Sequence, residues 1–170
     1  MNYSQYNQIK IYGIIWSTVF IAIILQIIPL NSYFYSIRPN FILLIIFFWI
    51  TTKPYYFNIY SSCLIGIILD TLYSNTIGVN GIIYACFAFI IYRMHLLFKH
   101  FHIIKQMLFI FTFTLSYQLI LYHSKYVING NAQIHWENFQ NIITTTLCWP
   151  WLYWLLTQLQ EKHKIHHNTK

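Results

Sequence analysis

Long apolar runs separated by narrow bands of charge constrain this chain more than any other feature. Of its 170 residues, 58% are hydrophobic, 21% are aromatic and only 8% are charged, whereas a soluble domain carries about 25% charged residues. Ten basic and three acidic side chains cannot cover the surface of a soluble globule. The composition excludes a soluble enzyme, a disordered tail and a disulfide-stapled secreted domain. It predicts an all-α integral membrane protein that crosses the bilayer several times.

Six membrane spans are predicted, because a helix needs about 20 residues, and at least about 17, to cross the hydrocarbon core. Proline, Asn-Gly pairs and basic residues mark the breaks between the apolar runs. The second span is short, and Pro150 is expected to kink the sixth. The chain is thus expected to form a single polytopic membrane domain, residues 1–170, with spans at about 12–28, 40–52, 56–72, 77–92, 106–122 and 139–157.

The distribution of basic residues predicts the orientation of these spans. Six spans place both termini on one side of the membrane. With both termini in the cytoplasm (N-in, C-in), eight of the ten Lys and Arg residues are cytoplasmic, and only Arg38 and Lys125 are outside. The opposite orientation would violate the positive-inside rule. The net charge of +7 is therefore interpreted as a topological signal, and no nucleic-acid partner is expected, since nucleic-acid binding needs basic residues clustered on one exposed face.

Asp70 is the only carboxylate within a predicted span, where a charge costs roughly 2.5–3.5 kcal/mol at the bilayer centre. The six-span topology places Asp70 at the outer end of the third span, at a depth similar to that of Arg38 at the start of the second. One hypothesis is an ion pair between these two side chains. The alternatives are that Asp70 caps the turn at 75–78 or reaches the wet interface, or that it belongs to a proton or ion relay.

No residue set predicts catalysis, a metal or a cofactor. Ser, His and an acid do not occur in a recognisable hydrolytic arrangement. The three cysteines are widely spaced and form no CxxC pair, which argues against a disulfide framework or a zinc site. His163, His166 and His167 would share one face of a continued helix, but a solvated basic tail explains them better than a metal site. The basic loop at 93–105 is interpreted as a contact with anionic lipid or a filament partner.

Arg38-Pro39-Asn40 precedes the second span, and Gly66-Ile67-Ile68-Leu69-Asp70 ends the third, followed by Ser74-Asn75-Thr76-Ile77-Gly78-Val79 at the start of the fourth. Trp149-Pro150-Trp151 lies within the sixth span. In this order and along nearly the whole chain, these three motifs resemble the MreD family of rod shape-determining proteins in its proteobacterial form. The residues of these motifs are the candidates for structural or interaction roles. They are Arg38, Pro39, Asn40, Asp70, Gly78, Trp149, Pro150 and Trp151.

The resemblance implies a non-catalytic, multi-pass protein of the bacterial inner (cytoplasmic) membrane. Such a protein would scaffold or regulate lateral peptidoglycan synthesis in the cell-elongation (rod shape) complex. Its implied partners are a bitopic MreC-like protein, an MreB-like actin homologue, RodA and a class B penicillin-binding transpeptidase, besides the lipid bilayer. The turn at 74–81 and the loop at 123–137 are the candidate contacts with the MreC-like protein.

The family is also thought to resemble in fold the membrane substrate-binding subunits of energy-coupling-factor transporters. This likeness gives the alternative function, a small-molecule-binding membrane subunit of a vitamin-type transporter. Such a subunit requires polar groups that converge on a cavity open to the outside. Arg38, Asn40 and Asp70 are the only cluster that offers them.

Overall fold

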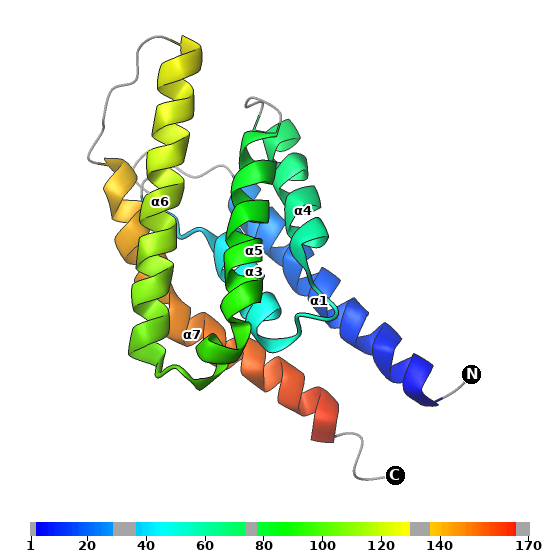
Figure 1. Ribbon diagram of the computed structural model, residues 1–170. Coiled ribbons are helices and arrows are strands. Elements are labelled where there is room, and N and C mark those ends of the chain that lie inside the picture. The colour runs from blue at the N-terminus through cyan, green and yellow to red at the C-terminus, as the bar shows by residue number, and fades with distance from the viewer. Residues whose placement is uncertain (1–2, 29–36, 74–77, 130–136, 166–170) are drawn as a thin grey trace.

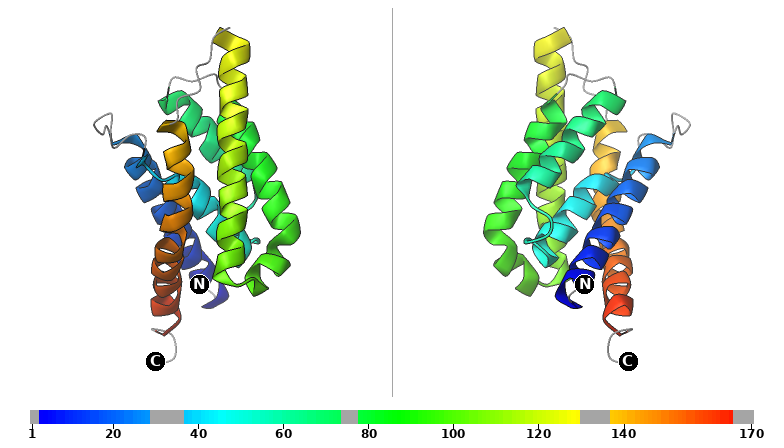
Figure 2. Two further views of the ribbon diagram at one scale, coloured as in Figure 1. Left: turned by 90° about the vertical axis from the view of Figure 1, so that its left-hand side faces the viewer. Right: turned by 90° about the vertical axis from the view of Figure 1, so that its right-hand side faces the viewer.

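The computed structural model describes residues 3–28, 37–73, 78–129 and 137–165. The regular elements of these ranges are helices: α1 (Tyr3–Ile27), α3 (Phe41–Thr52), α4 (Ile59–Leu72), α5 (Val79–His100), α6 (Ile103–Asn129) and α7 (Glu137–Ile165). They form one bundle (Figure 1). The N-terminal end of α1, the C-terminal end of α7 and the α5–α6 turn lie at one end of the bundle, and the last turns of α4 and α6 lie at the other (Figure 2).

Three of these helices are long and apolar enough to cross a membrane, over Gln8–Ile27, Val79–Phe98 and Ile103–Ser124. By contrast, α3 and α4 have 12 and 14 residues, or about 18 and 21 Å at 1.5 Å per residue. Both are shorter than the hydrocarbon core, which is about 30 Å thick. By length and composition, three helices of the described part of the chain are thus candidates to cross a membrane.

The central helix of the bundle is α3. Its residues from 42 to 51 are all buried, as expected of a helix that is hydrophobic on every side. It packs against α1, α5 and α7, and the indole nitrogen of Trp49 donates a hydrogen bond to the Thr18 hydroxyl of α1, 2.9 Å away. Neighbouring helices cover α3, so it does not have to meet lipid along its whole length.

Among the described helices, α4 and α5 pack most closely. A Cβ atom added to Gly66 would lie 2.6 Å from the Gly81 Cα atom and from the Asn80 carbonyl oxygen. A Cβ atom added to Gly81 would lie 2.9 Å from Ile67 Cγ1. Small residues allow helix backbones to approach this closely inside a membrane. These two glycines therefore set the distance between α4 and α5.

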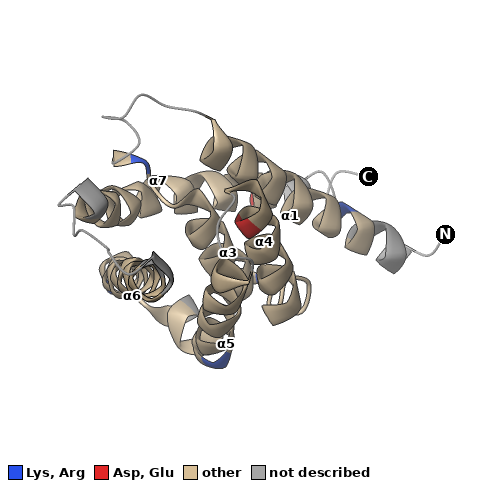
Figure 3. Cartoon of the chain, turned by 90° about the horizontal axis from the view of Figure 1, so that it is seen from above, with Lys and Arg blue, Asp and Glu red and all other residues tan. Residues whose placement is uncertain are grey.

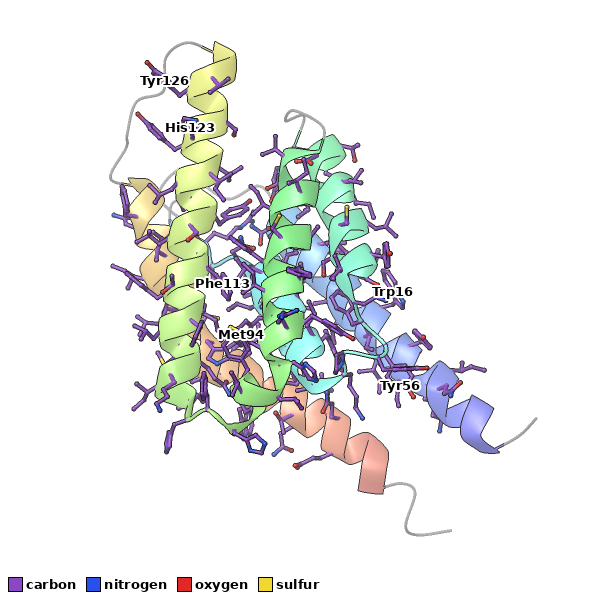
Figure 4. The ribbon with its side chains drawn as sticks, viewed as in Figure 1. Trp16, Tyr56, Met94, Phe113, His123 and Tyr126 are labelled. Atoms are coloured by element: carbon purple, nitrogen blue, oxygen red, sulfur yellow. The ribbon has the colours of Figure 1, made fainter. Side chains whose placement is uncertain are left out.

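Aromatic side chains fill the interior toward the α5–α6 turn. Phe47 of α3 makes edge-to-face contacts with Phe98 of α5 and Trp149 of α7, with 5.1 Å between ring centroids in each pair. Edge-to-face geometry is a preferred arrangement of aromatic rings. Farther along α6, Phe113 packs on Phe87 of α5 with 5.0 Å between centroids, and Figure 4 shows it on the side of α6 that faces α5.

Several helix ends differ from those predicted. The predicted loop at 93–105 is wrong over most of its length, because α5 continues to His100 and α6 already begins at Ile103. The predicted loop at 123–137 is likewise helical up to Asn129. The charged and polar residues of these segments predict helix breaks, whereas a helix can continue beyond a membrane surface with such residues on its outside. Pro150 lies within α7, which changes direction along its length (Figure 1), since proline removes one helical hydrogen bond.

Candidate functional site

Asp70, which is fully buried near the end of α4, binds the beginning of α5. Its Oδ2 accepts hydrogen bonds from the backbone N–H groups of Gly78, at 2.8 Å, and Asn80, at 3.1 Å, and its Oδ1 accepts one from Asn80 Nδ2, at 2.7 Å. The first N–H groups of a helix have no partner within the helix. Gly78, at the N-cap position of α5, has no side chain to bind them. Asp70 therefore caps α5 from the neighbouring helix, with its negative charge at the positive end of the helix dipole.

The backbone of Gly78 contributes to this cap. Its φ angle is 101°, in the left-handed region that glycine adopts at little cost and other residues rarely adopt. Gly78 thus serves the site through its conformation and its N–H group.

Arg38 binds the end of α1. Its side chain is 6% exposed, and its terminal nitrogens donate hydrogen bonds to the main-chain carbonyl groups of Gln26, at 2.6 Å, and Ile28. The last carbonyl groups of a helix lack helical partners and carry partial negative charge. The Tyr73 hydroxyl donates to the same Gln26 carbonyl, also at 2.6 Å. Arg38 and Tyr73 therefore fasten the end of α1 to the segment before α3 and to the end of α4.

The predicted ion pair between Arg38 and Asp70 is wrong. Neither side chain forms an ion pair with any residue that the structure describes; each is bound to the end of a helix instead. The alternative in which Asp70 caps the turn agrees with its hydrogen bond to Gly78, although residues 75–77 of that turn lie outside the described part. Figure 3 shows an acidic residue, coloured red, on α4 within the bundle.

Asn80 extends these contacts from α4 and α5 to α6. Its Oδ1 accepts a hydrogen bond from the Tyr117 hydroxyl, 2.9 Å away. The Tyr117 ring stacks on the ring of Tyr84 in α5, with 5.7 Å between centroids and 5° between planes. Asn80 and Tyr84 are both buried, so these polar groups depend on one another rather than on water for their partners.

Asn40 continues the network into α3 and α7. Its side chain lies 3.4 Å from the Tyr84 hydroxyl, and its Oδ1 accepts a hydrogen bond from the Leu43 N–H at 3.1 Å, which caps α3. Its own N–H donates to the Thr145 hydroxyl of α7, 2.9 Å away. We call the set Asp70, Asn80, Tyr117, Tyr84, Asn40 and Thr145 the polar network. It connects five of the described helices at one end of the bundle.

The Trp149-Pro150-Trp151 motif divides between the interior and the outer surface. Trp149 is fully buried and donates its indole N–H to Gln106 Oε1 of α6, 3.1 Å away. Trp151 is 61% exposed, because two residues along a helix differ by about 200° in direction. Pro150 and Pro39 are half-buried.

The prediction from sequence missed Asn80, Tyr84, Gln106, Tyr117 and Thr145. The sequence did contain a signal for the amide side chains of Asn80 and Gln106, because a polar side chain in an apolar run must find a partner inside the protein. Tyrosine gave a weak signal, since the chain has 15 of them. Among the described residues, no group of three His, Cys, Asp or Glu side chains could hold a metal ion.

The fold and the polar network define a class of protein: a helical membrane protein whose buried polar side chains tie its helices together. The family can be stated as well. The chain belongs to the MreD family, since the family model described as rod shape-determining protein MreD matches residues 7–159. The predicted resemblance is confirmed, and membership supports a role in determining rod shape.

A similar curated protein is the rod shape-determining protein MreD of Haemophilus influenzae (strain ATCC 51907 / DSM 11121 / KW20 / Rd). The two are 24% identical over 155 residues, which cover 89% of this chain and 95% of that protein. No solved structure matches the chain.

Proposed function

We propose that this chain is a non-catalytic component of the cell-elongation complex in the bacterial inner membrane. In this role it scaffolds or regulates lateral peptidoglycan synthesis together with an MreC-like bitopic protein and an MreB-like actin homologue, alongside RodA and a class B penicillin-binding transpeptidase. The observation that carries the proposal is the family match, which covers residues 7–159.

We further propose that the six described helices lie in one membrane domain, with both termini in the cytoplasm. The apolar stretches of α1, α5 and α6 support three spans by their length. The burial of α3 by its neighbours and the close packing of α4 on α5 explain how two short helices can be included. Both ends of the described chain lie at the end of the bundle that holds the α5–α6 turn (Figure 2), which agrees with the distribution of basic residues.

The bonding of the motif residues supports a scaffold over a transporter subunit. The transporter alternative requires Arg38, Asn40 and Asp70 to converge on a cavity that opens outward. Instead, the three side chains bind the end of α1, the beginning of α3 and the beginning of α5. Their polar groups are used to join helices, so they offer little to a small molecule.

The end of α6 is the surface that we propose for the MreC-like protein. Tyr126 and Val127 are both more than half exposed, and Figure 4 shows His123 and Tyr126 on the side of α6 that faces away from α5. Large apolar side chains that a bundle leaves uncovered near its end fit contact with another membrane helix. Residues 74–77 and 130–136 of the two predicted contact segments lie outside the described residues.

Affinity purification tests both the function and the contact. The tagged full chain is purified in mild detergent from the bacterium that encodes it, as wild type, as Tyr126→Ser/Val127→Ser and as Leu96→Ser/Leu97→Ser. The last is a matched control, since it also removes two adjacent exposed apolar side chains, but at the other end of the bundle. We expect wild type and the control to retain the MreC-like protein and the α6 variant to lose most of it.

The outcomes separate the two proposals. Recovery of an ATPase-coupled transport module or a bound small molecule with wild type would contradict the elongation function. Equal recovery of the MreC-like protein with both variants would leave that function standing and would contradict only the contact at the end of α6.

A further inference from the structure

The turn between α5 and α6, which we call the elbow (residues 93–108), is held in one shape by buried contacts. Gln106 lies inside it and donates its Nε2 to the carbonyl groups of Phe98, at 3.1 Å, and Phe101, at 3.2 Å. Its Oε1 accepts the indole hydrogen bond of Trp149 from α7. Each polar atom of the Gln106 side chain is thus used to fix the elbow, so its outer surface is preorganised for binding.

That outer surface combines basic and large apolar side chains. Four apolar side chains are more than half exposed: Leu96, Leu97, Ile104 and Leu108. The exposed basic side chains among them are Arg93, His100, His102 and Lys105. Figure 3 shows a basic residue, coloured blue, on the outward edge of α5. A surface of this kind has the composition of a segment that lies at a membrane interface.

No carboxylate of α5 or α6 can neutralise these cations. The sequence has no Asp or Glu between Asp70 and Glu137, and Asp70 is buried at the beginning of α5, at the other end of that helix. The Lys105 Nζ atom lies 5.6 Å from the centroid of the Phe101 ring, a cation–π distance that orients the ammonium group without neutralising it. Glu161, near the end of α7, is exposed at the same end of the bundle and forms no ion pair with a basic side chain of the described elbow. The elbow therefore presents positive charge that no carboxylate among the described residues neutralises.

We infer that the elbow binds the headgroups of anionic phospholipids. A lipid phosphate supplies the negative charge that these helices lack, and the adjoining acyl chains cover the exposed leucine and isoleucine side chains. The exposed apolar surface continues along α5 at Phe89 and Ile90 and along α6 at Phe111, so the elbow lies at the edge of a surface suited to lipid. An acidic protein would neutralise the cations but would leave the apolar side chains beside polar groups.

Native mass spectrometry of the full chain in mild detergent tests the inference. The probe is an equimolar mixture of phosphatidylglycerol and phosphatidylethanolamine with identical acyl chains. We expect wild type to retain more phosphatidylglycerol. We expect Arg93→Gln/Lys105→Gln to lose this preference by about five-fold for each cation removed, since a basic residue near an anionic surface contributes about 1 kcal/mol. Both side chains are exposed, so folding should be unaffected, and a monodisperse gel-filtration peak checks this.

Two matched variants distinguish a local site from an effect of total charge. Arg93→Lys/Lys105→Arg keeps both charges and should keep the preference. Lys125→Gln removes a cation near the other end of α6 and should also keep it. Equal retention of the two lipids by wild type would overturn the inference, as would an unchanged preference in the neutral double variant or an equal loss in Lys125→Gln. Loss of a bound acidic protein with no change in lipid preference would assign the elbow to that protein instead.

Discussion

The hydroxyl of Tyr117 in α6 donates a hydrogen bond to the side-chain oxygen of Asn80 in α5, 2.9 Å away. The amide nitrogen of the same Asn80 donates to Asp70 of α4, so one side chain joins three helices. Hydrogen bonds between membrane helices contribute about 0.6 kcal/mol on average and at most about 1.7 kcal/mol. The main effect of Asn80 is therefore to specify which helices meet, because a wrong pairing would leave buried polar groups without partners.

Removal of the Asp70 carboxylate should destabilise the fold more than removal of the hydroxyl group of the neighbouring Thr71. Asp70→Ala leaves three N–H groups at Gly78 and Asn80 without their acceptor, and we expect a loss of about 3 kcal/mol, since each unsatisfied buried donor costs about 1–3 kcal/mol. The control is Thr71→Ala, because Thr71 is exposed and its hydroxyl bonds only within α4. Reversible unfolding in SDS mixed micelles, followed by circular dichroism, measures both. Equal stability of the two variants would contradict the capping role.

A double-mutant cycle tests the finding that Arg38 and Asp70 do not pair. Arg38→Gln and Asp70→Asn should each lower stability, because each side chain binds a different helix end. Their effects should add to within about 0.5 kcal/mol, as for sites without shared partners. The same unfolding assay on the two single variants and the double variant gives the coupling energy. A favourable coupling above about 1 kcal/mol would indicate an ion pair.

The sequence predicted that Arg38 and Asp70 lie at the same side of the membrane and at similar depth, but it left open whether Asp70 pairs with Arg38 or caps the turn that precedes α5. Depth follows from the order of apolar runs. Whether Arg38 and Asp70 pair with each other or each bind the end of a helix depends on how α4 and α5 are oriented relative to each other. That orientation follows from the contact of Gly66 with Gly81, which joins residues of two different predicted spans. Apolar pattern alone carries no information about such a contact.

Helix ends were predictable where proline and polar residues coincide. The predicted segment at 40–52 and the observed α3, Phe41–Thr52, differ by one residue, because Asn40 caps one end and Lys53-Pro54 follows the other. For α5 the predicted end at 92 and the observed end at His100 differ by eight residues. A charged residue such as Arg93 predicts the start of a loop, yet the backbone can remain helical where the chain leaves the membrane.

An alanine at position 66 should destabilise the protein, whereas an alanine at position 13 should not. The Cβ atom of Gly66→Ala would lie 2.6 Å from the backbone of α5, which cannot move without separating the two helices, and overpacking of this kind costs about 1–3 kcal/mol. Gly13 lies in α1 with nothing within 4 Å of the added atom. Gly13→Ala should be neutral or stabilise by up to about 1 kcal/mol. Unfolding in SDS mixed micelles compares the two, and destabilisation of equal size would contradict the close approach at Gly66.

The two tryptophans of the Trp149-Pro150-Trp151 motif should differ in their effect on stability. Trp149→Phe removes the hydrogen bond to the buried Gln106 Oε1 and leaves a void beside Phe47. We expect a loss of about 2–4 kcal/mol, because an unsatisfied acceptor and a cavity both contribute. Trp151→Phe makes the same chemical change at an exposed position and should stay within about 0.5 kcal/mol of wild type.

The same pair separates a packing role from a binding role. Unfolding in SDS mixed micelles measures stability, and the amount of MreC-like protein retained on affinity purification measures binding. If Trp149 acts through packing, Trp149→Phe should lower stability, while any binding that remains should fall only in proportion to the folded fraction. A Trp149→Phe variant of wild-type stability that has lost the partner would contradict this role and would place Trp149 in an interface. A Trp151→Phe variant that loses the partner at unchanged stability would identify the exposed side of α7 as a second contact.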